Sequence, residues 1–216
     1  KLFDHNLSAH IPALREFEST PELEASPLYA RLRPDIETVL GGILYGGEQQ
    51  SSSSPPPTSI RATAWNLERG LNLEGILRIL GEHPRMRESD LFLLTELDHG
   101  MTRSGNRFVA KEIASALGLQ YAFAPCYLSL DKGSGVEQLT RGENEQALHG
   151  NALFSRYPIQ DAHTVSLPNG KDKMKGTEKR LGCQRAVVGT VDHPLGRFRA
   201  VSLHLDAHSS QKHRFR

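Results

Sequence analysis

Three polar residues come directly after apolar runs, at points where buried strands are expected to end. Asn66 follows "IRATAW", Glu96 follows "LFLLT", and His204 follows "VSL". Ligands in layered α/β proteins bind at the carboxyl ends of strands, so we expect these side chains to share one edge. An amide oxygen and a carboxylate are ligands for a hard divalent ion, which predicts an Mg²⁺ site at Asn66 and Glu96, with Mn²⁺ as the alternative ion. At the same edge, His204 can donate a hydrogen bond to a phosphoryl oxygen as charge develops there.

Each of these residues also has an alternative interpretation. Asn66 can cap the loop that follows it, and Glu96 can form a surface ion pair. A different metal centre is the third alternative. His204, Asp206 and His208 alternate along one strand and can bind Zn²⁺, with His213 as a fourth ligand.

The elements that position these residues alternate between strand and helix. Apolar periodicity predicts strands over 59–66, 90–98, 121–125 and 150–159 and helices over 71–83 and 106–118. Asn106 is the expected N-cap of the second helix, and Gly118 is expected to end it. A polar loop over 167–183 precedes a β-hairpin that turns between His193 and Gly196. This order indicates an α/β (α+β) layered domain.

A linker divides the chain. Residues 46–59, "GGEQQSSSSPPPTS", carry no hydrophobic side chain and cannot contribute to a core. Residues 1–45 are expected to form a small helical N-terminal extension, with helices over 11–18 and 33–42 and with Pro34 in the first turn of the second. Residues 1–59 hold 4 Lys and Arg against 8 Asp and Glu, and residues 60–216 hold 22 against 17, so the basic excess lies in the second part.

Composition excludes several classes of protein. With 38% hydrophobic and 24% charged residues, the chain has the make-up of a globular protein and not of a disordered one. No apolar run approaches the roughly 20 residues that cross a bilayer, so we expect a soluble protein, with the cytoplasm favoured. We also expect the protein to be a monomer. The two cysteines, Cys126 and Cys183, are too few for a disulfide framework, but a single disulfide between them is an alternative to two free thiols.

The motifs "TAWNLERG", "DLFLLTELD", "GNALFSRYPI" and "VSLHLDAH" resemble, in order and spacing, the first four motifs of the endonuclease/exonuclease/phosphatase superfamily. The resemblance covers residues 60–216. It implies a two-layer β-sandwich flanked by helices and a metal-dependent hydrolase of phosphoesters. Nucleic acids, phospholipid head groups and inositol phosphates all offer such a bond, and the motifs do not select among them.

The resemblance also assigns roles to single residues. Asn66 and Glu96 match the Mg²⁺ and phosphate site, with Glu96 as the principal carboxylate ligand, and His204 matches the histidine that contacts the scissile phosphate. Substrate-binding positions are Asn151, Arg185 and Asp206; for Arg185 a strand-edge salt bridge is the alternative.

The superfamily's later motifs, which supply a Ser-Asp-His base and a Gly-Asp-Phe-Asn acidic site, are missing from these 216 residues. We therefore expect the chain to be an inactive N-terminal portion of a parent hydrolase. The alternative from another class is a binding module of the same fold that holds phosphate without cleaving it. The run 171–185, with six Lys and Arg against two Asp and Glu, would then contact nucleic acid or an anionic lipid surface.

Overall fold

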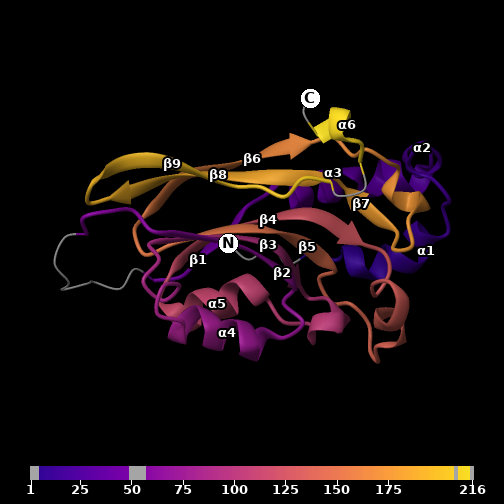
Figure 1. The fold of residues 1–216 in the computed structure, drawn as a ribbon. Helices are drawn as coiled ribbons and strands as arrows, with labels where there is room; N and C mark the ends of the chain where they lie inside the picture. Colours follow the sequence, from indigo (N-terminus) through magenta and orange to yellow (C-terminus); the bar gives the residue numbers. More distant parts are fainter. Residues whose placement is uncertain (1–4, 49–56, 207–208, 215–216) are drawn as a thin grey trace.

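The computed structural model describes residues 5–48, 57–206 and 209–214. Two β-sheets pack face to face, and helices cover the outer face of the larger sheet (Figure 1). This is the mixed α/β sandwich flanked by helices that the sequence predicts. In the described part of the chain, no helix has both the length and the apolar content to cross a membrane.

The larger sheet has the strand order β1-β4-β5-β3-β2, with β7 added to β4. The strands are β1 (Leu44–Gly46), β2 (Ala62–Arg69), β3 (Leu91–His99), β4 (Gln120–Ser129), β5 (Leu148–Ser155) and β7 (Arg180–Gly182). β2 and β3 are parallel, whereas β5 is antiparallel to both β3 and β4. β3 lies between β5 and β2, so the motifs of those two strands flank it on either side.

The smaller sheet has the order β6-β8-β9 and is antiparallel throughout. Its strands are β6 (Ile159–Leu167), β8 (Gln184–His193) and β9 (Gly196–Ser202). The predicted hairpin between β8 and β9 is confirmed, with His193 paired to Gly196, whose φ of 125° suits glycine. Leu91, Ala122, Ala124 and Leu153 of the larger sheet pack against Val187, Val191 and Ala200 of the smaller one.

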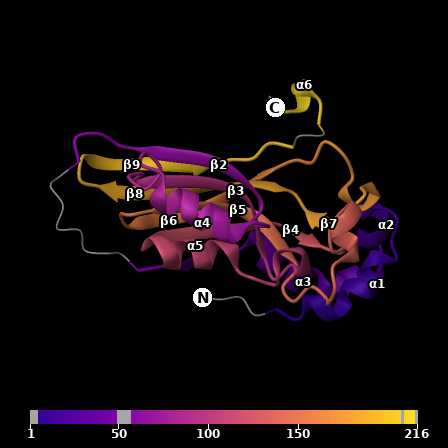
Figure 2. The same ribbon diagram turned by 60° about the horizontal axis from the view of Figure 1, so that its bottom comes forward.

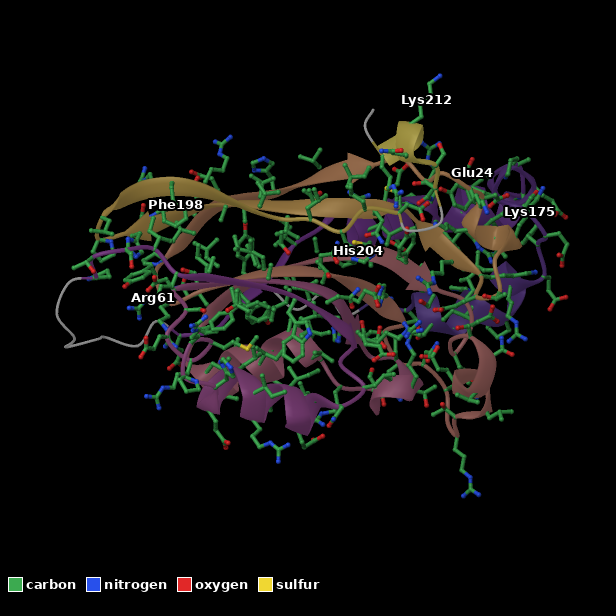
Figure 3. The ribbon with its side chains drawn as sticks, in the orientation of Figure 1. Glu24, Arg61, Lys175, Phe198, His204 and Lys212 are labelled. Carbon is green, nitrogen blue, oxygen red and sulfur yellow. The ribbon has the colours of Figure 1, made fainter. Side chains whose placement is uncertain are left out.

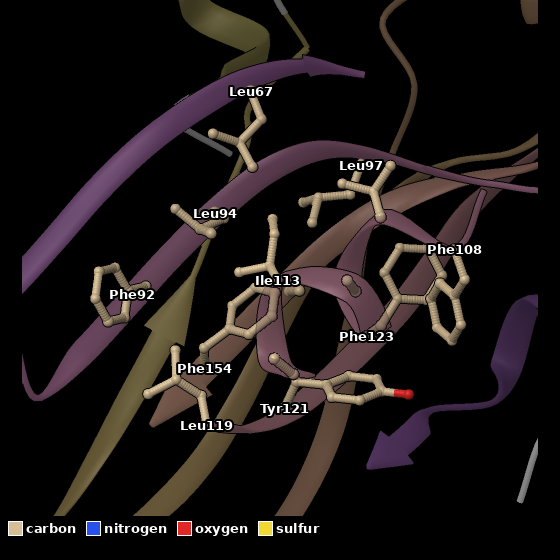
Figure 4. Packing of buried hydrophobic residues seen from close by; sticks show 14 of the residues in the cluster. Leu67, Phe92, Leu94, Leu97, Phe108, Ile113, Leu119, Tyr121, Phe123 and Phe154 are labelled. Carbon is tan, nitrogen blue, oxygen red and sulfur yellow. The ribbon is translucent and has the colours of Figure 1, made fainter. Parts of the chain in front are cut away.

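Helices α4 (Leu73–Glu82) and α5 (Val109–Leu117) cover the other face of the larger sheet (Figure 2). Each has one apolar stripe, which buries Leu73, Ile76 and Leu80 on α4 and Val109 and Ile113 on α5. Figure 4 shows this core, where the strand side chains Phe92, Phe123 and Phe154 meet α5. Removing such a buried aromatic side chain costs about 3 to 5 kcal/mol of stability, so this core fixes the sheet that carries the site.

The N-terminal region is helical and packs against one end of the sandwich. It contains η1 (Leu7–His10), α1 (Ile11–Arg15), α2 (Thr20–Glu24) and α3 (Pro27–Gly41). Leu14, Leu23, Ile36 and other apolar residues of these helices share a core with Leu128 of β4 and Leu181 of β7. The remaining short helices are η2 (Thr102–Ser104), η3 (Gly135–Leu139), η4 (Lys173–Lys175) and α6 (Gln211–Arg214).

Several local predictions are wrong. α3 begins at Pro27, capped by the Ser26 hydroxyl, and Pro34 lies inside it, because burial of the helix's apolar face outweighs the hydrogen bond that proline cannot donate. Gly46, predicted to lie in the linker, ends β1, which pairs with β4. A strand of three residues leaves no periodicity to detect. The described linker residues are 46–48 and 57–59.

The start of α5 also differs from the prediction. Phe108, not Asn106, occupies the N-cap position. Asn106 has a φ of 55°, and its side chain donates to the carbonyl of Glu143 at 2.9 Å. Asparagine tolerates this left-handed conformation, so the residue pins a loop and does not cap a helix. Gly118 ends α5 in the left-handed conformation, as predicted.

Candidate metal and phosphate site

The sequence predicts that Asn66 and Glu96 lie where their strands end. In the structure, both residues instead lie at irregularities inside the strands. β2 continues to Arg69 and β3 continues to His99. The β2–β3 register shifts after Asn66, and the β3–β5 register shifts between Leu94 and Leu97. Bulges of this kind turn a side chain out of the regular alternation and occur beside active sites.

The backbone at Glu96 is strained. Its φ of 56° is in the left-handed region, which costs a residue with a Cβ roughly 1 to 2 kcal/mol. The backbone N–H of Glu96 donates to Oδ1 of Asn151 on β5 at 3.3 Å. Asn151 thus supports the backbone conformation of Glu96 from the neighbouring strand.

Asn66 contacts Glu96 directly. The amide Nδ2 of Asn66 donates to Oε1 of Glu96 at 2.9 Å, while its Oδ1 accepts the backbone N–H of Glu68 at 2.9 Å. The second bond is the loop cap that the alternative interpretation predicts, and the first joins Asn66 to the expected metal ligand. The Asn66 side chain therefore stabilises the backbone of β2 at Glu68 and orients the Glu96 carboxylate.

His204 reaches the same place from the smaller sheet. β9 ends at Ser202, whose hydroxyl donates to the carbonyl of Leu94 on β3 at 3.3 Å. Two residues later, Nε2 of His204 lies 3.6 Å from Oε1 of Glu96, and its Nδ1 lies 3.4 Å from the hydroxyl of Thr95. Figure 3 shows His204 between the two layers. The structure thus brings Asn66, Glu96 and His204 together.

The other assigned residues are placed differently. Nδ2 of Asn151 donates to the backbone carbonyl of Arg185 at 3.0 Å, so Arg185 meets Asn151 through its main chain. The guanidinium of Arg185 donates to the hydroxyl of Thr164 on β6 at 3.3 Å. Oδ2 of Asp206 accepts from the N–H of Gly170 at 3.1 Å and from Nζ of Lys173 at 2.9 Å. Asp206 is 8% exposed and ties the polar loop to the His204 segment.

The electrostatics of the site favour an ionised Glu96. Burial acts to raise the pKa of this carboxyl, but the hydrogen bond from Asn66 and the nearby His149, His204 and Arg69 outweigh it, so the pKa lies below its usual value. The Glu96 side chain is 25% exposed and that of His204 is 20% exposed. A ligand can therefore reach a carboxylate that is kept charged. Next to it, Asn66 and Thr95 border an open hollow of about 330 Å³ whose other walls are Ala64, Trp65, Leu93, Val201 and Leu203.

Behind the site lies a buried charge network that sequence reasoning missed. Asp98 is fully buried and receives two hydrogen bonds from the guanidinium of Arg103, at 2.7 and 2.9 Å. Arg103 also donates to both oxygens of Glu178, at 3.1 and 3.2 Å. Nδ1 of His149 lies 2.8 Å from Oδ1 of Asp98. Burial acts to raise the pKa of Asp98, but Arg103 and His149 hold it below its usual value.

His149 and Asp98 form a histidine–aspartate pair of the type expected for an activating base, but its surroundings differ from those of a base. His149 is 5% exposed, and burial lowers its pKa despite the Asp98 contact. The pair therefore braces the end of β3 next to Glu96. The only sequence signal is that Asp98 follows Glu96 by two residues in "TELDH", which places both side chains on one face of a regular strand.

The donor set fits a hard divalent ion held by one carboxylate. Mg²⁺ is commonly bound through one or two carboxylates and keeps several waters, and Glu96 is ionised and accessible. Both contacts of the Glu96 carboxylate named above, with Asn66 and His204, use Oε1. The described residues contain no cluster of three or more His, Cys, Asp or Glu side chains suited to a metal ion. For the zinc alternative, His208 and the side chain of His213 lie outside the described residues.

The basic run 171–185 is largely engaged within the protein. Lys173 pairs with Asp206, and Arg180 pairs with Glu178. Nζ of Lys179 donates to the carbonyls of Arg15 and Phe17, at 2.9 Å each. Cys126 and Cys183 are unbridged, and burial raises the pKa of the Cys126 thiol to about 12.

Comparison with solved structures finds partial likenesses. An endonuclease/exonuclease/phosphatase family protein from Leptotrichia buccalis C-1013-b is similar with a TM-score of 0.46 and 13% identity, over 68% of this chain and 55% of that one. The 3′ phosphatase NExo from Neisseria, bound to product DNA hairpin, has a TM-score of 0.38 and 18% identity, over 66% and 40%. The 3′-5′ exonuclease NExo from Neisseria meningitidis has a TM-score of 0.35 and 19% identity, over 62% and 38%.

This chain spans about half or less of the length of these structures. The first of them carries the name of the family whose motifs the sequence resembles. No protein-family model matches the chain, and no curated protein matches it in sequence.

Proposed function

We propose that this chain carries the metal and phosphate site of an Mg²⁺-dependent phosphoester hydrolase. The observation that supports the proposal is the meeting of Asn66, Glu96 and His204 at one point, from β2, β3 and the segment after β9. These residues are separated by 30 and 108 positions in sequence, and they are the three that the motif resemblance assigns to metal and phosphate.

Each residue has a distinct task in this proposal. Glu96 would hold the metal ion, because it is the ionised and accessible carboxylate of the site. Asn66 orients that carboxylate through its amide N–H, and Asn151 supports the strained backbone behind it. His204 faces the same point and can donate an imidazole N–H to a phosphoryl oxygen, which stabilises charge that grows there.

Mg²⁺ held by Glu96 would supply Lewis-acid chemistry, that is, polarisation of a phosphoryl oxygen and neutralisation of charge on the leaving group. The protein's own contribution is to fix the carboxylate and the imidazole before the substrate arrives. Such preorganisation avoids the cost of arranging dipoles during the reaction.

The proposal covers phosphoesters in nucleic acids, phospholipid head groups and inositol phosphates. A DNA hairpin is named with one of the similar structures, so DNA is a suitable first substrate to assay. Binding of a phosphoester without hydrolysis is the other outcome that the same site allows.

Metal-dependent binding and hydrolysis of bis(4-nitrophenyl) phosphate and of a labelled DNA hairpin, with Mg²⁺ or Mn²⁺, test the proposal. Without the later motifs we expect the wild-type chain to bind the hairpin in a metal-dependent way with little or no turnover. Glu96→Gln keeps the shape of the side chain and removes its charge, and we expect it to weaken this binding at least about tenfold and to lower any measurable turnover about 100-fold or more. Glu37→Gln, on the exposed surface of α3, is the matched control and should be unchanged. Equal metal-dependent binding, or equal measurable turnover, by wild type and Glu96→Gln would contradict the proposal.

A further inference from the structure

The loop 168–176, called here the bridging loop, contacts the N-terminal helices on one side and the His204 segment on the other. Its two central residues, Asp172 and Lys173, contact different parts of the protein. Asp172 accepts two hydrogen bonds from Thr20 at the start of α2, from the backbone N–H at 3.0 Å and from the hydroxyl at 2.6 Å. Lys173 donates to Oδ2 of Asp206 at 2.9 Å. A direct path of contacts thus leads from α2 to a residue two positions after His204.

The bridging loop is anchored firmly on the side of the N-terminal helices. Asp172 also caps η4 by accepting the N–H of Met174 at 3.0 Å. The Met174 side chain is 1% exposed and packs in one cluster with Leu7, Leu14 and Leu23 of the N-terminal helices. Figure 3 shows Lys175 of η4 and Glu24 of α2 at the same end of the molecule. An anchored loop of this kind can hold another segment in place.

The His204 segment needs such an anchor because the sheet does not extend to it. The last pair in the β8–β9 ladder joins Val187 to Ser202. Beyond it, Asp206 accepts from Lys173 and from the N–H of Gly170, and its carbonyl accepts from the N–H and the hydroxyl of Ser209. The chain around His204 is therefore fixed at Ser202 by the ladder and at Asp206 by the bridging loop.

We propose that Lys173 and Asp172 are positioning residues, through which the N-terminal helices hold His204 against Glu96. The proposal rests on the function proposed above and gives a role to residues 1–45. The Lys173 and Asp206 side chains are only 18% and 6% exposed, so removing the ammonium takes away a charge-assisted hydrogen bond that is largely shielded from water. Such a change is costly enough to release the segment, unlike the loss of an exposed pair.

Hydrogen exchange of the segment 203–206, followed by mass spectrometry, tests the contact with Asp206. We expect Lys173→Met to speed exchange in this segment about threefold or more, because the segment loses its anchor. Lys171→Met, in the same loop and exposed, is the matched control and should leave exchange unchanged. Lys173→Arg restores a cation and should restore protection.

The contact with α2 is tested from a distance. Thr20→Val removes the hydroxyl that bonds to Asp172, and we expect the same segment 203–206 to exchange faster although Thr20 does not touch it. Thr38→Val is the control, because its hydroxyl donates to the carbonyl of Pro34 within the same helix, α3. The double variant Thr20→Val/Lys173→Met should exchange no faster than Lys173→Met alone, since both act through one path.

Activity separates this proposal from the proposed function. If the protein hydrolyses phosphoesters, Lys173→Met should lower kcat on the order of tenfold, through misplacement of His204, and leave Mn²⁺ affinity unchanged. Exchange in segment 203–206 that is equal in Lys173→Met and Lys171→Met would overturn the positioning role whatever the activity. Faster exchange in a protein that binds neither Mn²⁺ nor a phosphoester would support the positioning role and count against the proposed function.

Discussion

The Asn66 amide bridges two strands by donating to Oε1 of Glu96 at 2.9 Å while accepting from the N–H of Glu68 at 2.9 Å. Both of its polar atoms are committed, so its orientation is fixed. The carboxylate that it contacts has a lowered pKa, which keeps Glu96 charged in weak acid. The Asn66 side chain therefore both caps the loop and contacts the expected metal ligand.

Asn66→Ala should shift the pH at which metal binding is lost. Removing the hydrogen bond raises the pKa of Glu96 toward its ordinary value or above it, because burial is then less opposed. A smaller fraction of Glu96 is then ionised at each acidic pH, so Mn²⁺ binding should fail at a higher pH than in the wild type. Mn²⁺ titrations between about pH 4 and 7 measure this midpoint, where the carboxylate titrates. An unchanged midpoint would show that Asn66 does not tune Glu96.

Glu96→Gly should be more stable than Glu96→Ala by about 1 kcal/mol. The φ of 56° at this position is strained for alanine and unstrained for glycine. Both variants lose the carboxylate and should lose metal binding equally. Urea unfolding of the two proteins measures the difference, and equal or reversed stabilities would mean that the backbone relaxes without cost.

Arg103→Met should destabilise the fold by about 3 to 5 kcal/mol at neutral pH, because it leaves the buried carboxylate of Asp98 without its arginine and removes one of the two arginines that contact Glu178, which keeps Arg180. Burial would then be less opposed at Asp98 and its folded-state pKa would rise, so the penalty applies at neutral pH and shrinks as falling pH protonates this carboxylate. Denaturant unfolding at two pH values measures this trend.

Arg33→Met is the control for Arg103→Met. Arg33 pairs with Glu37 on the surface, where the two side chains are 62% and 58% exposed. Its loss should leave the stability nearly unchanged, because solvent screens an exposed pair. Similar costs for the two substitutions would show that the network around Arg103 is not a major source of stability.

Gly150→Ala should destabilise the protein by about 1 to 3 kcal/mol or more. A Cβ at Gly150 would lie 2.1 Å from the carbonyl oxygen of Ala124. This oxygen belongs to the backbone and cannot rotate away as a side-chain atom can. Gly41→Ala is the matched control, since a Cβ there meets nothing within 4 Å and α3 ends at this residue. Thermal unfolding compares the two, and a loss at Gly41 equal to that at Gly150 would contradict the packing argument.

The sequence predicts the layers and the three converging residues because those signals are local. Continuous apolar runs identify β3, and helical spacing identifies α4 and α5. The hairpin at His193 and Gly196 follows from its turn residues. Asn66, Glu96 and His204 stand out because each is the polar residue that follows an apolar run.

The rest depends on contacts between distant residues. Nothing local distinguishes the Asp98–His149 pair, whose members are 51 positions apart, from ordinary polar residues. The bulge that turns Glu96 out of β3 depends on the register with β5, which periodicity does not give. From the sequence alone, Lys173 is interpreted as a solvated loop residue and Asp206 as a substrate-binding residue. Their ion pair is seen only in the folded structure.

Mn²⁺ binding, followed by electron paramagnetic resonance of the unbound ion, tests the central claim most directly. The account predicts one Mn²⁺ site per chain in the wild type, an affinity at least about tenfold lower in Glu96→Gln, and no change in Glu37→Gln. Equal Mn²⁺ affinity in the wild type and Glu96→Gln would contradict the assignment of Glu96 as the metal ligand.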